Sequence, residues 1–386
     1  MAEINTNRTE EQNSVAAALA IRGGIIDAAT GFGKTRTLIK TVEIIRESFP
    51  HYRTVWAVPT EKLRDEDIPE DIRKWRAGDK FQCDTVCYKS LGDYSGGDIL
   101  VLDEFHHITE INMAGYLKNP PKIILAASAT SPTSDEKKAI IKHFGLKLIR
   151  KISLHEATEK QYVNEFEIHL CKVAIDKEKK YLKGFKHQGK VTEDQRNTDI
   201  NALVGRIVRE KGRAPMHILL MRKRALASFL TKEAIAKKVI KKWQDKRTLI
   251  FCSSIEQAER LCQDFYHSQT DDIALERFNK GKIQHLSCVQ ALDEGVNMTN
   301  VENVIIISPD AQIRRLLQRI GRGIRKAENQ ERCKVCLIVS TNTQEEVWVD
   351  NNLKELKLPE DKVKIYHYEQ SNGTFIIKQN SSEINT

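Results

Sequence analysis

The stretch GIIDAATGFGKT, from Gly24 to Thr35, indicates the fold of this chain more than any other part of it. A short apolar run, Gly24–Ala28, is typical of a buried strand. A loop with two glycines comes next, and a helix-compatible segment follows from Arg36 to Ser48. A strand, a glycine-containing loop and a helix in this order form the phosphate-binding loop of nucleotide-binding α/β proteins. The alternative is an ordinary tight turn beside a lysine, since Ala28 stands where such loops usually open with glycine.

The residue types of this loop suit a bound triphosphate. Glycines such as Gly31 and Gly33 allow backbone N–H groups to turn inward, which a Cβ would obstruct. Lys34 can reach the β- and γ-phosphates, and the Thr35 hydroxyl can ligate Mg²⁺. We therefore predict ATP and Mg²⁺ as cofactors. The predicted nucleotide-binding residues of the loop are Thr30, Gly31, Phe32, Gly33, Lys34, Thr35 and Arg36.

A second apolar run, Ile99–Leu102, ends in two adjacent carboxylates, Asp103 and Glu104. The carboxyl ends of parallel strands are where ligands bind in open α/β sheets. Asp103 is predicted to hold Mg²⁺, and Glu104 to orient and deprotonate the attacking water. Adjacent acids repel each other, so they need a cation or a proton between them. The alternative is an exposed loop that carries two acids by chance. The glycine loop and the acidic strand end together, however, predict an ATPase.

Short apolar runs alternate with helix-compatible segments along most of the chain, which predicts the α/β class with parallel sheets. The runs are nearly continuous, as expected for strands covered on both faces. In the first half the predicted strands are Gly24–Ala28, Thr54–Val58, Cys83–Cys87, Ile99–Leu102 and Lys122–Ala127. In the second half they are Phe166–Ala174, Arg247–Cys252, Ile283–Val289, Asn303–Ile307 and Lys334–Val339.

This pattern divides the chain into a domain of residues 1–150 and a domain of residues 151–386. Residues 145–161 are expected to form the hinge region. Residues 151–245 are expected to hold a linker, the first strand and a helical lead-in or insertion. The insertion is rich in lysine and arginine between residues 177 and 224, which suits either a phosphate backbone or a solvated helical face. Asn372-Gly373 between two alternating runs, residues 363–368 and 374–378, predicts a small C-terminal β-hairpin.

The bulk composition narrows the class of partner and the compartment. A net charge of +9 favours a polyanion, although a soluble enzyme with surplus surface lysine remains an alternative. No apolar run approaches the ~18 residues of a membrane span, and the polar N-terminus is unlike a signal peptide, so we expect a cytoplasmic protein without a membrane partner. Cys333 and Cys336 lie in an apolar run that predicts a strand, and a zinc site would need four ligands.

With these residues assigned, the sequence Asp103-Glu104-Phe105-His106 matches a DExH box. The chain resembles the superfamily 2 helicases, in the DExH branch that includes restriction-enzyme motor subunits and phage or bacterial repair helicases. The resemblance extends from about Gln12 to about Arg325. It implies two tandem RecA-like domains and an ATP-driven motor on nucleic acid, with DNA favoured over RNA. It also implies that Gln12 reads adenine.

The resemblance implies roles for further residues. Arg322 and Arg325, in the run QRIGRGIR from Gln318, match arginines that stabilise the transferring phosphoryl group; a basic helix face would be the alternative if this motif stood alone. Gln318 is implied in catalysis beside them, Gly295 and Asn297 in nucleotide binding, and His106, Ser128 and Thr130 in coupling hydrolysis to domain movement. The residues implied in nucleic-acid contact are Pro59, Thr60, Tyr88, Ser253 and Ser254.

The predicted function is therefore an ATP-dependent nucleic-acid helicase or translocase, most plainly a DNA enzyme of repair, recombination or replication. One alternative is a duplex-translocating motor subunit of a restriction or defence complex, which would need a nuclease partner. Others are an RNA helicase, a clamp that uses ATP only as a switch, and a small-molecule kinase. Glu104 and the arginine pair argue against the clamp, and the second domain argues against the kinase.

Overall fold

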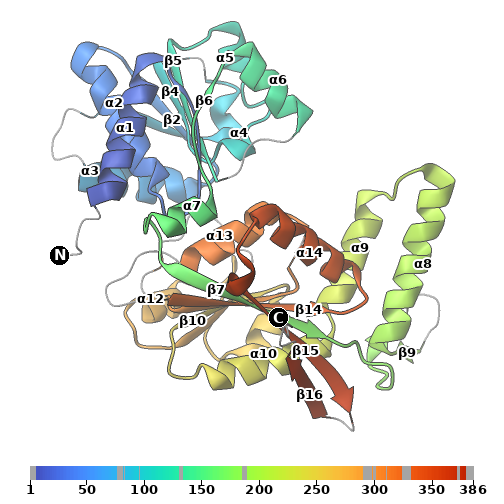
Figure 1. Cartoon of the computed structure of the whole chain (residues 1–386). Coiled ribbons are helices and arrows are strands. Elements are labelled where there is room, and N and C mark those ends of the chain that lie inside the picture. Colours follow the sequence, from blue (N-terminus) through green and yellow to red (C-terminus); the bar gives the residue numbers. More distant parts are fainter. Residues whose placement is uncertain are drawn as a thin grey trace, which may run out of the picture. The chain divides into compact units, whose positions relative to one another are not determined.

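The computed structural model of the chain describes residues 6–75, 81, 83–94, 96–129, 134–184, 189–289, 298, 301–309, 311–323, 332–371 and 374–379. The chain forms two compact units, Met1–Val163 and Asn164–Thr386. Each unit is built around a mainly parallel sheet, which confirms the predicted α/β class (Figure 1).

The first unit contains a six-stranded sheet in the order β3-β2-β4-β5-β1-β6, with every pair parallel. Helices α1, α2 and α3 lie on one face of this sheet, and α4, α5 and α6 pack on the other (Figure 1). The strands are β1 (Gly24–Ala28), β2 (Thr54–Val58), β3 (Cys83–Cys87), β4 (Ile99–Leu102), β5 (Ile123–Ser128) and β6 (Leu148–Ile152). The helices are α1 (Thr6–Arg22), α2 (Lys34–Ser48), α3 (Ile68–Trp75), α4 (Tyr88–Leu91), α5 (Ala114–Lys118), α6 (Asp135–His143) and α7 (Leu154–Glu159).

The second unit contains an eight-stranded sheet in the order β11-β12-β10-β13-β14-β7-β15-β16. Its pairs are parallel except the terminal β15–β16 hairpin, which confirms the predicted hairpin. The strands are β7 (Glu165–Val173), β10 (Thr248–Cys252), β11 (Phe265–Tyr266), β12 (His285–Val289), β13 (Asn303–Ile307), β14 (Arg332–Ser340), β15 (Val363–Ser371) and β16 (Thr374–Gln379). Cys333 and Cys336 are buried on β14, as the apolar run predicted.

Helices cover both faces of this second sheet (Figure 1). Helices α10 and α11 pack on one face, and α13 and α14 on the other. The helices of this unit are α8 (Glu193–Lys211), α9 (Met216–Ala227), α10 (Leu230–Lys242), α11 (Ile255–Leu261), α12 (Ile273–Asn279), α13 (Ile313–Gly323) and α14 (Gln344–Leu356).

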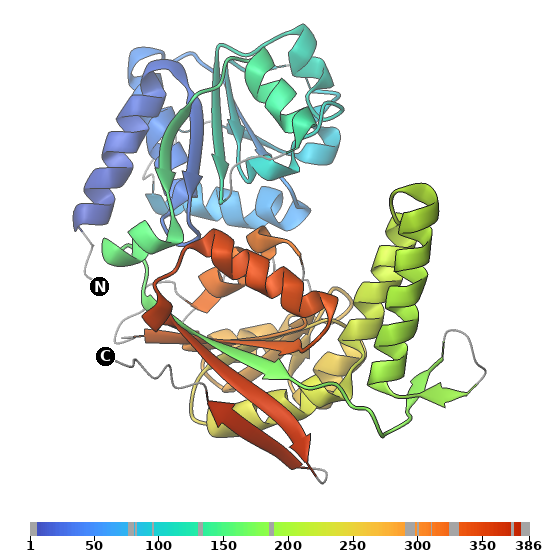
Figure 2. The same cartoon turned by 45° about the vertical axis from the view of Figure 1, so that its right-hand side comes forward.

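The basic insertion of the second unit is a helical arm. Strands β8 (Leu182–Lys183) and β9 (Lys190–Val191) form a short ladder of their own, and α8 and α9 then pair as a helical hairpin that projects from the sheet (Figure 2). In the described part of the chain, no helix is both long enough and apolar enough to cross a membrane.

The expected hinge at residues 145–161 is instead part of the first unit. Strand β6 pairs with β1, and α7 follows it, so the boundary between the units lies after Val163 and not at residue 150. The sequence obscured this strand because it lies at the edge of the sheet and carries Arg150 and Lys151. An edge strand is covered less than a central one, so it lacks the continuous apolar run that marks the others.

Candidate functional site

The glycine loop joins β1 to α2 with the backbone geometry that its glycines allow. Gly31 and Gly33 both have a φ of 95°, in the left-handed region that favours glycine. A Cβ on Gly31 would lie 2.8 Å from Cγ1 of Val163, and one on Gly33 would clash with Nε2 of Gln12. A Cβ at either position would displace a neighbouring side chain, so the left-handed backbone is the stronger reason for glycine at both.

Buried contacts fix this loop against the rest of the first unit. The Gln12 amide donates to the Phe32 carbonyl at 2.5 Å, and the Phe32 ring lies 5.7 Å from the ring of Tyr162. Lys34 is buried, and its Nζ donates to the Ala28 carbonyl across the loop at 3.2 Å. The lysine charge is thus held over the loop, where phosphate oxygens would lie.

Thr35 and Asp103 meet at the carboxyl edge of the sheet, although one strand, β5, separates β1 from β4. The Thr35 hydroxyl donates to Asp103 Oδ2 at 3.1 Å. Burial first, and the charge of Glu104 second, raise the pKa of Asp103 to about 6, while Lys34 and Thr35 oppose that rise. A desolvated carboxylate beside a hydroxyl provides hard oxygen ligands, and the Lys34 charge does not cancel the rise in its pKa, so this pair fits Mg²⁺. Metal clusters of three or more His, Cys, Asp or Glu side chains are absent from the described part of the chain.

Glu104 adopts a strained backbone conformation next to this pair. Its φ of 52° and ψ of 53° lie in the left-handed region, which is costly for a residue with a Cβ. Its Oε2 lies 3.4 Å from Nδ1 of His106, and the Ser128 hydroxyl lies 3.5 Å from the same nitrogen. The Glu104 carboxylate and the Ser128 hydroxyl at the end of β5 therefore lie near the same nitrogen of His106. Thr130, the other predicted coupling residue, lies outside the described residues.

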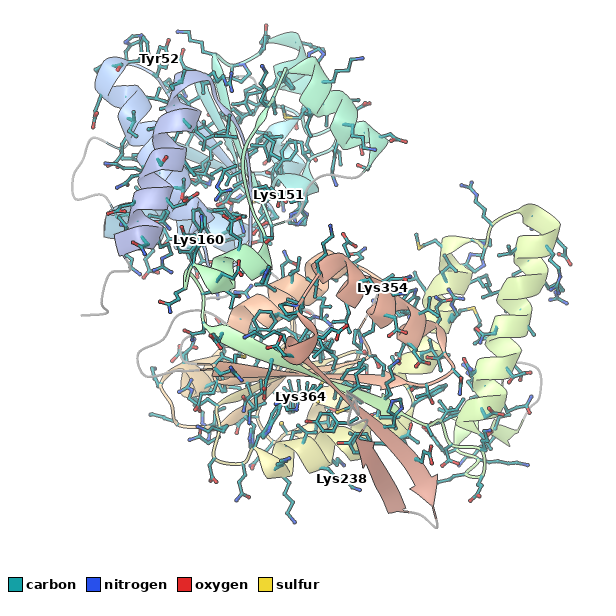
Figure 3. All side chains as sticks on the ribbon, in the orientation of Figure 1. Tyr52, Lys151, Lys160, Lys238, Lys354 and Lys364 are labelled. Atoms are coloured by element: carbon teal, nitrogen blue, oxygen red, sulfur yellow. The ribbon has the colours of Figure 1, made fainter. Side chains whose placement is uncertain are left out.

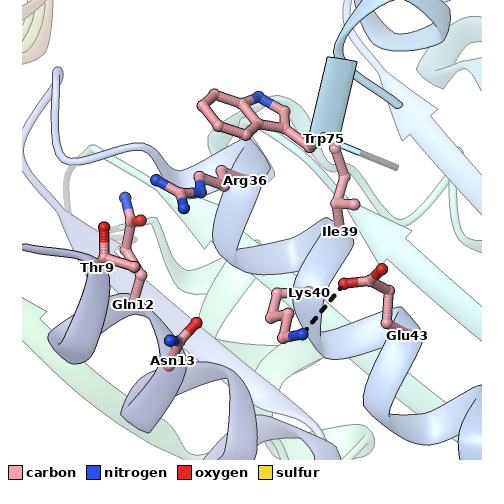
Figure 4. Close-up of a pocket in the computed structure, with 8 residues that line it drawn as sticks. All are labelled: Thr9, Gln12, Asn13, Arg36, Ile39, Lys40, Glu43 and Trp75. Carbon is pink, nitrogen blue, oxygen red and sulfur yellow. Dashed lines mark ion pairs between the residues drawn. The ribbon is translucent and has the colours of Figure 1, made fainter. Parts of the chain in front are cut away.

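A pocket of about 340 Å³ opens beside the loop, between helices α1, α2 and α3 (Figure 4). The Arg36 guanidinium packs over the ring of Trp75, 4.4 Å from its centre. Within the described structure, Oε1 of Gln12 is buried and accepts no hydrogen bond. A planar ring with an exocyclic amino donor would satisfy that oxygen and pack on the flat guanidinium. The residues that line the pocket are Thr9, Gln12, Asn13, Arg36, Ile39, Lys40, Glu43 and Trp75.

In the second unit, helix α13 carries Gln318 and Arg322. The neighbouring Arg319 guanidinium lies 5.1 Å from the ring centre of Phe251, which anchors the helix on its own sheet. Arg325, Gly295 and Asn297 lie outside the described residues.

Comparison with known proteins agrees with this geometry. Residues 231–327 match the family model of the helicase conserved C-terminal domain. The chain is 23% identical over 359 residues to the DNA 3'-5' translocase XPB2 of Sulfurisphaera tokodaii, and the match covers 84% of this chain and 79% of that protein. The Hef helicase domain of Pyrococcus furiosus has a similar structure, with a TM-score of 0.59 at 12% identity, over 88% of this chain and 97% of that domain. These matches support the resemblance to the superfamily 2 helicases that the sequence motifs indicate.

Two further matches are to proteins longer than this chain. The chain is 21% identical to Putative helicase 22 of Sulfolobus islandicus filamentous virus, and the match covers 88% of this chain but 64% of that protein. The structure of the ATP-dependent Type ISP restriction-modification enzyme LlaBIII bound to DNA has a TM-score of 0.58 at 13% identity. That match covers 97% of this chain and 32% of the restriction enzyme, so the chain corresponds to about a third of it.

Most of the residues predicted to contact nucleic acid lie at the ends of strands. Pro59 and Thr60 are half-buried after β2, and Thr60 Oγ1 accepts from the backbone N–H of Leu63 at 3.3 Å. After β10, Ser254 caps α11 by accepting from the N–H of Gln257 at 3.2 Å, and the Ser253 hydroxyl donates to the Ile307 carbonyl at 3.3 Å. These hydroxyls order the strand-end segments.

Tyr88 differs from this group. It is buried, and its hydroxyl donates to the main-chain carbonyl of Asp103 at 2.8 Å. The predicted direct contact of Tyr88 with nucleic acid therefore conflicts with where the structure places its side chain.

One contributor to the glycine loop was missed by the sequence analysis. Arg8 on α1 donates to the carbonyl of Tyr162 at 3.1 Å and to that of Gly31 at 3.5 Å. Burial, and then the charge of Arg36, lower its pKa. No local pattern marks this contact, because Arg8 and Tyr162 are 154 residues apart in the sequence.

Proposed function

We propose that the chain is an ATPase stimulated by nucleic acid that uses hydrolysis to move along DNA as a helicase or translocase of the DExH branch. The observation that carries this proposal is the meeting of Thr35, Asp103 and Glu104 beside the glycine loop and Lys34. The match to the helicase conserved C-terminal domain supports ATP hydrolysis. The relative named as a DNA translocase supports DNA as the polymer.

The residues of the first unit have different roles in this proposal. Lys34 and the loop N–H groups bind the β- and γ-phosphates, and Thr35 and Asp103 would hold Mg²⁺, which neutralises phosphate charge when bound. Glu104 orients a water and accepts its proton. Gln12 and Arg36 accept the adenine ring in the pocket of Figure 4.

The roles of the remaining predicted residues belong to the same proposal. Arg322 and Arg325 stabilise the transferring phosphoryl group, with Gln318, Gly295 and Asn297 supporting the nucleotide. His106, Ser128 and Thr130 couple the loss of that phosphate to movement of the chain. Pro59, Thr60, Ser253 and Ser254 order the segments that meet the polymer's phosphates, and such contacts carry position without sequence information.

The decisive test is ATP turnover with no polymer, single-stranded DNA, duplex DNA, a fork and RNA. We expect low basal turnover and a many-fold increase with at least one DNA, because helicases of this kind commit to hydrolysis only when the polymer is bound. Turnover that no polymer changes would overturn the proposal. A larger increase with RNA than with any DNA would reassign the polymer.

A duplex-translocating motor of a restriction system is the second candidate. The structural match to a DNA-bound restriction enzyme, over nearly the whole of this chain, favours it. A strand-displacement assay run beside a triplex-displacement assay separates the two. Displacement of the third strand without separation of the duplex would support the restriction-type motor and a nuclease partner.

The arm formed by α8 and α9 is proposed to add a phosphate-binding surface. Residues 202–224 carry seven lysines and arginines but only one acidic residue, Glu210. Arg206, Arg209 and Arg213 are all exposed on this arm. Residues 193–227 contain no Phe, Tyr or Trp, so the arm offers charge to phosphates but no ring for stacking on bases.

Replacing Arg206, Arg209 and Arg213 together with glutamine is expected to weaken duplex binding and to lower the slope of log Kd against log salt by about 2–3. The matched control removes three exposed charges from α10, by Lys237→Gln, Lys238→Gln and Lys241→Gln; Lys238 is labelled in Figure 3. Binding is measured by fluorescence anisotropy across a salt series. Equal slopes for the two triple variants would argue against the arm.

A further inference from the structure

Tyr88 connects the ends of two strands that are not neighbours. It begins α4 directly after β3, whereas Asp103 directly follows β4, and β2 lies between those strands. The tyrosine hydroxyl crosses this gap to donate to the Asp103 carbonyl at 2.8 Å. Both groups are buried, so water does not replace this hydrogen bond easily.

The carbonyl that Tyr88 holds belongs to the strained peptide between Asp103 and Glu104. Glu104 has a φ of 52°, and the N–H of this same peptide donates to Oδ1 of Asp103 at 3.0 Å. Tyr88 thus holds one end of the peptide and Asp103 the other. A strained conformation persists only where surrounding contacts over-determine it, and the Tyr88 hydrogen bond is one of those contacts.

The other side of α4 faces solvent with polar groups. Lys89 and Ser90 are exposed, and Lys89 forms an ion pair with Glu61 in the segment that follows β2. The Tyr88 carbonyl in turn accepts from Nδ2 of Asn112 at 2.8 Å, which ties α4 to the chain beyond the acids. A polymer phosphate that competes with Glu61 for Lys89 would therefore act on a short helix whose first residue holds the catalytic peptide.

We propose that Tyr88 is a positioning residue that couples nucleic-acid contact at α4 to the Asp103–Glu104 peptide. Movement of α4 is passed through the tyrosine hydroxyl to the carbonyl of that peptide, and so to the direction of the Glu104 carboxylate. The proposal rests on the proposed function, because it requires turnover that responds to a polymer.

The test compares Tyr88→Phe with Tyr116→Phe. Tyr116 is also buried in the same core, and its hydroxyl likewise donates to a main-chain carbonyl, that of Gly96, at 2.8 Å. Each change removes one buried hydroxyl, so the two variants should lose similar stability. For each variant we would measure ATP turnover with and without the most stimulating DNA. We would also measure KM for ATP, Kd for that DNA and the midpoint of thermal unfolding.

We expect Tyr88→Phe to lower the ratio of stimulated to basal kcat about tenfold, because small misplacement of a catalytic group is costly. KM for ATP and Kd for DNA should stay within about twofold, and Tyr116→Phe should keep the wild-type ratio. The proposal is overturned if both variants keep that ratio, if both lose it equally, or if Tyr88→Phe loses DNA affinity at unchanged kcat. A wild-type chain that no polymer stimulates would overturn the proposed function as well, whereas these variant results would leave it standing.

Discussion

Glu104→Gln is expected to reduce ATP turnover by about 10²–10⁴-fold, the range that a positioned general base contributes, while ATP still binds. The amide keeps the size and shape of the side chain, and so preserves the left-handed backbone at this position. It removes the carboxylate that would accept the proton of the attacking water. Lys34, Thr35 and the glycine loop are unchanged, so the affinity for ATP should stay close to wild type.

The matched control for this prediction is Glu110→Gln. Glu110 is an exposed glutamate in the same segment of the first unit, and its substitution removes the same charge. Turnover is followed by phosphate release, and binding by a fluorescent ATP analogue. Wild-type hydrolysis by Glu104→Gln would remove Glu104 from the role of general base, and weak analogue binding would instead assign it to the binding of ATP.

The sequence predicted the sheets well for a physical reason. Strands such as Thr54–Val58 and Ile99–Leu102 are covered on both faces, so all their side chains are buried and apolar patterning marks them directly. The same argument failed for β6 at the edge of its sheet. It also failed for β11, whose two residues are too few to form a pattern.

The site could be predicted only where its residues lie together in a short sequence motif. The glycine loop and the acidic pair are short segments whose chemistry is visible in the residues themselves, and the structure brings Thr35 and Asp103 into contact. The contacts of Arg8 and Tyr88 depend on which strand ends the topology places together. A buried tyrosine and an exposed one look alike in sequence, so the contact of Tyr88 with Asp103 could not be predicted.

Asp103→Asn is expected to change stability and activity in opposite directions. Burial and Glu104 raise the pKa of Asp103 to about 6, above its value of about 3.9 in an unfolded chain. The folded, nucleotide-free chain therefore binds the proton more tightly than the unfolded chain. Its stability falls as the pH rises from about 4 to about 6, and the loss persists at higher pH. The amide cannot ionise, so the variant escapes this loss.

At pH 7 the free energy of unfolding should therefore rise by up to about 3 kcal/mol in Asp103→Asn, because the pKa shift is about two units and each unit corresponds to about 1.4 kcal/mol. Turnover should fall by about 10²-fold or more, since the variant lacks the carboxylate proposed to hold Mg²⁺. Urea unfolding at pH 4 and pH 7, without nucleotide, measures the first effect; Asp93→Asn, at an exposed acid, is the control. The gain should vanish at pH 4, where the wild-type carboxyl is protonated. A variant less stable than wild type at pH 7, or a gain that persists unchanged at pH 4, would contradict the prediction. Either result would show that the buried charge of Asp103 does not destabilise the nucleotide-free chain.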